Sequence, residues 1–88
     1  MSTTLKKQLS KKFWLEFSNI FTENIDEKYF DFFFQLQDVF DIQSDDEDEY
    51  CQEMANWSKE KQQVFLNDCF TILKDYDKNK VVKLIDKY

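Results

Sequence analysis

The chain has 88 residues, of which 42% are hydrophobic and 18% aromatic, and its formal net charge is −6. This length gives a single modest core, and the aromatic content excludes a disordered chain, because disordered chains are poor in aromatic residues. The sequence contains no Gly and no Pro. Tight β-hairpins depend on Gly at positive φ, whereas helices with short polar connections do not. We therefore predict one all-α domain over residues 1–88, folded as a compact bundle of four to five short helices.

The negative charge is concentrated in the middle of the chain. Residues 1–22 carry four Lys and one Glu, residues 23–56 carry one Lys and twelve acids, and residues 57–88 carry seven Lys and five acids. The middle segment therefore has a net charge of −11 between two mildly basic segments. Nucleic-acid phosphates would be repelled by such a segment, and the chain has no Arg to read phosphates or bases. This pattern argues against direct nucleic-acid binding.

The first predicted helix covers residues 4–22. Thr3 or Thr4 would cap it, and apolar residues from Leu5 to Phe21 recur at three- and four-residue spacing. This spacing predicts one buried stripe, with the Lys residues on the solvated side. The segment has no continuous apolar run, which indicates neither a membrane span nor a secretory signal.

The second predicted helix covers residues 26–40 and is apolar around an unusually broad arc. Phe30 and Phe34 lie at the edge of this arc, on the same side as Gln37 and Asp41. A helix this apolar is either the centre of the bundle or the carrier of a partner surface. The two Phe residues therefore either contact another helix of the same chain or face outward with Gln37 and Asp41 beside them.

The third predicted helix covers residues 45–57. Ser44 followed by Glu47 has the form of a capping box, and acids in the first turn suit the helix dipole. Tyr50 and Trp57 lie on the apolar face of this helix, and acids occupy the opposite face. The cap explains only the first turn of acids, so the remaining acids are candidates for a functional surface.

The last part of the chain predicts helices over residues 59–76 and 79–87, or one bent helix. Ser58 would cap the first of them, and Tyr76 falls on its core stripe. The charged stretch at residues 75–79 is the predicted break between the two helices.

Cys51 and Cys69 are the only cysteines, and both fall on predicted core faces. Two cysteines cannot complete a four-ligand zinc site, so we interpret them as small buried hydrophobic residues. Without a secretory signal, we expect reduced thiols and a cytoplasmic location.

The sequence lacks the parts of common enzyme sites. Without His there is no general base near neutral pH, and without Gly there is no phosphate-binding loop. Residues 75–86 resemble an EF-hand calcium loop in placing Asp75, Asp77 and Asn79, but Lys80 stands where the loop needs Gly. We therefore expect no enzymatic activity, no metal and no cofactor.

The acidic segment is the remaining functional candidate. Its sequence predicts a small acidic helical inhibitor that occludes a basic surface, nucleic-acid-binding in kind, on a partner protein such as a nuclease. Immunity proteins, antitoxins and phage anti-restriction or anti-CRISPR proteins that mimic DNA act in this way as classes, and the analogy is one of size and charge alone. The expected partner-binding residues are Phe30, Phe34, Asp38, Asp41, Asp45, Asp46, Asp48, Glu49, Tyr50 and Glu53.

The alternative is a structural or regulatory helical module that forms a homodimer, or packs on a partner helix, through its aromatic surface. The acids would then serve only to keep the protein soluble. Rising ionic strength weakens exposed charge pairs strongly and apolar association little, so the salt dependence of binding separates the two hypotheses.

Overall fold

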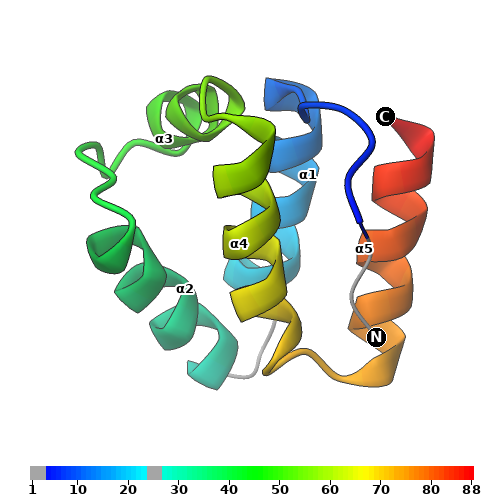
Figure 1. Cartoon of the computed structure of the whole chain (residues 1–88). Helices are drawn as coiled ribbons and strands as arrows, with labels where there is room; N and C mark the ends of the chain where they lie inside the picture. Colours follow the sequence, from blue (N-terminus) through cyan, green and yellow to red (C-terminus); the bar gives the residue numbers. More distant parts are fainter. Residues whose placement is uncertain (1–3, 24–26) are drawn as a thin grey trace.

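The computed structural model describes residues 4–23 and 27–88, and in this part of the chain the fold is all-α with five helices (Figure 1). This confirms the helical bundle predicted from the sequence. The radius of gyration of the Cα atoms is 11.8 Å, close to the value of about 12 Å expected for a folded chain of this length. The helices are α1 (Lys11–Thr22), α2 (Glu27–Val39), α3 (Glu47–Ala55), α4 (Lys59–Phe70) and α5 (Asp75–Lys87).

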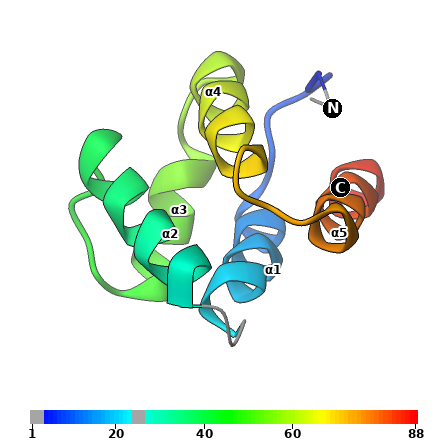
Figure 2. The ribbon, with the colours of Figure 1, turned by 90° about the horizontal axis from the view of Figure 1, so that it is seen from below.

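Helix α1 lies in the middle of the bundle. It contacts α2, α3 and α5, and both views place α2 and α3 on one side of it and α5 on the other (Figures 1 and 2). Because α1 is enclosed from several sides, its buried face is broader than a single stripe. The buried residues of α1 are Phe13, Trp14, Phe17, Ser18 and Phe21.

Aromatic rings form the centre of the core. The Phe17 ring of α1 and the Phe65 ring of α4 lie 6.5 Å apart between centroids. Phe65 also meets Phe33 of α2 at 6.1 Å and Trp57 at 5.4 Å, both edge to face. Edge-to-face pairs place the positive ring edge on the negative ring face, which adds to the gain from burial. Three helices and the connection between α3 and α4 are joined through these rings.

The first helix is shorter than predicted, because residues 4–10 are not helical. Helix α1 begins at Lys11, and its N-cap is Ser10, whose hydroxyl accepts a hydrogen bond from the Phe13 amide at 3.5 Å. Thr4 therefore does not cap it, and Thr3 lies outside the described residues. The segment runs between α4 and α5 (Figures 1 and 2), and Leu5 and Leu9 are buried as the apolar pattern required.

Glutamine side chains of α4 hold this N-terminal segment in place. Gln62, which is fully buried, accepts from the Leu9 amide at 2.7 Å and donates to the carbonyls of Leu9 at 3.1 Å and Met54 at 2.9 Å. Gln63 accepts from the Leu5 amide at 2.6 Å. These bonds pair the Leu5 amide and both backbone groups of Leu9, which have no helical hydrogen bonds.

Helix α3 is also shorter than the predicted range of 45–57, and its cap is different. The N-cap is Asp46, whose carboxylate accepts from the Glu49 amide at 3.1 Å. Ser44 instead accepts from the Asp46 amide at 3.2 Å and donates to the Glu49 carboxylate at 2.6 Å. The expected apolar face is confirmed: Tyr50, Met54 and Trp57 are buried, although Trp57 lies beyond the end of the helix.

The predicted break at residues 75–79 was wrong. Helix α4 ends at Phe70 and α5 begins at Asp75, so the connection is residues 71–74. Asp75 and Asp77 lie in the first turn of α5, where acids favour a helix. Tyr76 is 71% exposed and is not a core residue. The predicted cap at Ser58 is confirmed by a 3.2 Å bond from the Lys61 amide.

The residues that resemble an EF-hand loop lie in this same helix. A continuous helix cannot fold around a calcium ion as a loop does. Within the described residues, no group of three or more Cys, Asp or Glu side chains is arranged to hold a metal ion. No helix of the described part is long and apolar enough to cross a membrane.

Candidate protein-binding surface

The acidic surface consists of the exposed acids at the end of α2, in the turn that follows it and on α3. Asp41 lies in that turn. Asp41 has a φ of 60°, and two backbone hydrogen bonds end the helix there. The Ile42 amide donates to the Gln37 carbonyl at 2.8 Å, and the Asp41 amide donates to the Asp38 carbonyl at 3.1 Å. This is the bond pattern of a Schellman motif, in which Gly usually takes the left-handed position. Asp is one of the few other residues that adopts this conformation readily.

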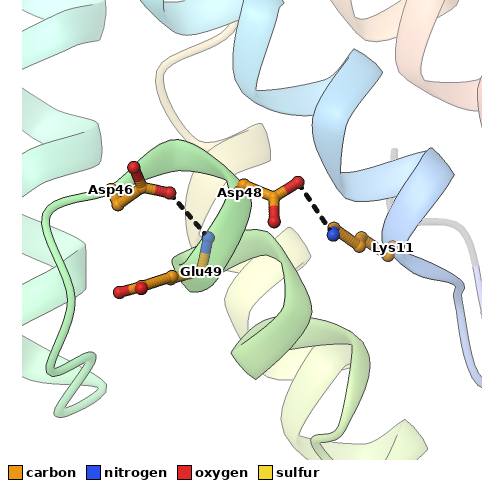
Figure 3. Close-up of polar contacts among 4 residues, drawn as sticks. All are labelled: Lys11, Asp46, Asp48 and Glu49. Carbon is orange, nitrogen blue, oxygen red and sulfur yellow. Dashed lines mark hydrogen bonds and ion pairs between the residues drawn. The ribbon is translucent and has the colours of Figure 1, made fainter.

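Several acids of the expected set have structural partners. Asp46 caps α3, and the Glu53 carboxylate accepts from the Gln43 amide of the turn at 3.2 Å. Figure 3 shows Asp48 pointing from α3 to α1, where its carboxylate lies 2.8 Å from the Lys11 ammonium, while Glu49 points away from α1. The Asp48–Lys11 pair is partly exposed and is worth at most about 1 kcal/mol. Glu49 accepts from the Ser44 hydroxyl and Asp41 accepts from the Gln43 amide group at 2.6 Å, so five of the seven expected acids have a local partner.

Asp38 and Asp45 remain without a partner in the described part of the chain. Both are exposed, and neither side chain takes part in a hydrogen bond or an ion pair. Glu47 in the first turn of α3, which was not among the expected residues, is also exposed and without a side-chain partner in the described part of the chain. Among the described residues, Asp48 is the only acid between residues 27 and 56 that forms an ion pair.

The two Phe residues at the edge of the α2 arc face outward. Phe30 is 41% exposed and Phe34 is 36% exposed, and their ring centroids lie 4.6 Å apart. Phe34 also keeps one contact with the core, since its ring centroid lies 6.4 Å from that of Phe33. Gln37 was expected beside them on the surface, but it is only 4% exposed, and its amide nitrogen has no hydrogen-bond acceptor among the described residues.

Tyr50 was expected to bind a partner, but it lies in the core. It is 3% exposed, and its ring packs against Phe33 with a centroid separation of 6.0 Å. Burial raises the pKa of Tyr50 to about 12, and a hydrogen bond with Ser18 offsets part of that rise. A side chain held in the core in this way is not available to a partner.

The two thiols are free and buried in the core. Burial raises the pKa of Cys51 to about 12 and that of Cys69 well above its usual value. Both thiols are therefore protonated at neutral pH, and the thiolate is the reactive form.

The chemistry left to this side of the bundle is electrostatic and apolar binding. The end of α2, the turn and α3 lie together on the side of α1 that is opposite to α5 (Figure 1). The structure thus brings Asp38, Asp41, Asp45, Asp46, Glu49 and Glu53 to one region, with the exposed rings of Phe30 and Phe34 on α2. Comparison with protein-family models, curated proteins and solved structures finds no match for this chain.

Proposed function

We propose that this protein is an inhibitor that occludes a basic surface of a partner protein with its acidic side. The main support for this proposal is the charge of residues 27–56. They hold ten acids and one Lys, and among the described residues only one of these acids forms an ion pair. Exposed charges of one sign that are left unpaired create a field over the surface, which steers a partner of opposite charge.

A nucleic-acid-binding partner fits this surface best. Carboxylates one helical turn apart stand roughly 5–6 Å from one another, a spacing that phosphate-binding Lys and Arg side chains can meet. The acids would replace phosphates on the partner and so block its access to nucleic acid. The inhibitor needs no catalytic group for this.

Self-association through the aromatic surface is the alternative. The exposure of Phe30 and Phe34 supports it. A stable dimer in light scattering that Phe34→Asp converts to a monomer would favour this alternative over the inhibitor.

The test is affinity capture from cells of the source organism at low and high salt, with mass spectrometry. We expect the wild-type domain to capture one protein with a basic surface, to lose it at high salt, and to lose it again when duplex DNA is added as competitor. Asp38→Lys with Asp45→Lys should abolish capture without unfolding the domain, because neither carboxylate has a partner within residues 4–23 and 27–88.

The matched control is Asp75→Lys with Asp86→Lys on α5. It changes the net charge by the same amount at two exposed positions outside the acidic surface. Capture that persists in the Asp38 and Asp45 variant, or that is lost equally in the α5 control, would show that this surface is not the binding site.

A further inference from the structure

The exposed rings on α2 continue into the acids along one side of the helix. Phe30, Phe34 and Asp38 are spaced four residues apart, which places them on one stripe about 12 Å long. Asp31 lies beside this stripe, about 60° from Phe34 around the helix, and Lys28 lies about 120° from Phe34. The stripe is therefore apolar at the Phe30–Phe34 end and negative at Asp38, with the Asp31 carboxylate on its flank, where Lys28 and Lys74 line the same pocket.

The charge on α2 decides what can cover this stripe. A second copy of the chain would bring its own Asp31 and Asp38 to the same place, and like charges at close range oppose association. Neither Asp31 nor Asp38 has an ion pair in the described part of the chain. A partner segment would complement the stripe in polarity and in charge if it placed an apolar side chain against the two rings and cationic side chains against the two acids.

The shape of the stripe favours a helical partner segment. A line of side chains parallel to a helix axis packs into the groove of another helix laid beside it. An amphipathic helix presents apolar residues at three- and four-residue spacing, with charged residues one turn away. Asp38 likewise follows Phe34 by four residues, which is about one helical turn.

We propose that Phe30 and Phe34, flanked by Asp31 and Asp38, form the docking site for a basic amphipathic helix of the partner. The apolar side chains of that helix cover the two adjacent rings, and its Lys or Arg residues pair with the two carboxylates. This inference rests on the proposed function for the basic character of the partner, and it adds the element that the partner contributes.

The probe is a synthetic Leu/Lys peptide of about five helical turns, with Leu at helical spacing, compared with a scrambled peptide of identical composition. Binding is measured by fluorescence anisotropy at low salt. We expect the amphipathic peptide to bind the wild-type domain at least about tenfold more tightly than the scrambled peptide. Phe30→Ala with Phe34→Ala should remove this preference, since the two rings provide the apolar contact.

Two further variants separate binding from folding. Phe30→Ala alone keeps the contact between Phe34 and Phe33, so it tests the site with less effect on the core. Tyr76→Ala with Val64→Ala is the control, because it removes exposed apolar side chains from α4 and α5 and leaves α2 intact. The control should keep the full preference for the amphipathic peptide, and thermal melting confirms that each variant is folded.

Several outcomes would overturn the docking site. Equal affinity for the two peptides, no binding of either, or an unchanged preference in the Phe variants would each do so, and so would a dimer that the Phe variants dissociate. If Asp38→Lys with Asp45→Lys abolishes binding of both peptides while the Phe variants change neither, the docking site fails and the acidic inhibitor stands. If the peptide docks on the rings but capture yields no nucleic-acid-binding partner, the proposed function fails and the docking site stands.

Discussion

At the scale of single residues, Gln62 has the most consequential role in the fold. Its spacing from Phe65, Leu66 and Cys69 puts it on the core stripe of α4, where a polar residue must be hydrogen-bonded. Its amide meets both backbone groups of Leu9 and the carbonyl of Met54. The sequence signal for this residue was a Gln at an apolar position of a helical stripe, but the partner groups lie 53 residues away for Leu9 and 8 for Met54.

We predict that Gln62→Ala lowers the free energy of unfolding by about 2 to 4 kcal/mol, because it leaves buried backbone groups unpaired. Gln52→Ala, at an exposed position of α3, should change it by less than about 0.5 kcal/mol. Urea denaturation of both variants measures the difference. A loss below 1 kcal/mol for Gln62→Ala would mean that the N-terminal segment does not depend on this side chain.

At the scale of elements, the chain ends and begins its helices without Gly or Pro. Polar side chains cap the starts of α1, α3 and α4: Ser10, Asp46 and Ser58. The end of α2 uses Asp41 in the left-handed conformation that Gly would adopt at no cost. The acid at position 41 therefore has a conformational role in addition to its charge.

The conformation of Asp41 predicts that Gly stabilises the protein at position 41 and destabilises it at position 38. Asp41→Gly should raise the free energy of unfolding by about 0.5 to 1 kcal/mol, because Gly relieves the cost of a positive φ. Asp38→Gly is the control, and it should lower stability by about the same amount, since Asp38 lies within α2. Thermal melting of the two variants tests this, and a loss of stability in both would exclude strain at position 41.

At the scale of the whole molecule, like charges gather on one side of the bundle. The acids of α2, the turn and α3 lie on one side of α1, and α5 with four of the Lys residues lies on the other (Figure 1). A solvated acidic face gives solubility, and under the proposed function this separation of charge would also orient the molecule toward a basic partner. The proposed function and the docking site both depend on it.

The core makes the stability of the whole molecule sensitive to alkaline pH. Burial raises the folded-state pKa values of Tyr50, Cys51 and Cys69 above those of the unfolded chain. Their contribution is thus fully present below the unfolded pKa of about 8.5 for Cys and is lost as pH rises toward the folded values. Each thiol that ionises only in the unfolded chain lowers stability by about 1.4 kcal/mol per pH unit.

We expect the free energy of unfolding, measured in urea with a reductant, to be nearly level from pH 7 to 8 and to fall by about 2 to 4 kcal/mol between pH 8.5 and 10. Cys51→Ala with Cys69→Ala should make this decline shallower, because the two thiols supply most of it below the range where Tyr ionises. A stability that does not change over this interval would contradict the burial of ionisable groups in the core.

The sequence by itself determined the helical class, the positions of α2 and α3 to within two residues at each end, the starting cap at Ser58 and the acidic character of the surface. These follow from residue spacing and composition, which act locally. Only the tertiary structure decided that residues 4–10 are not helical, because their backbone is satisfied by Gln62 and Gln63 from far along the chain. It likewise decided that Tyr50 is buried while Phe30 and Phe34 are exposed. Periodicity places a side chain on one face of a helix, but the packing of the other helices decides which faces are covered.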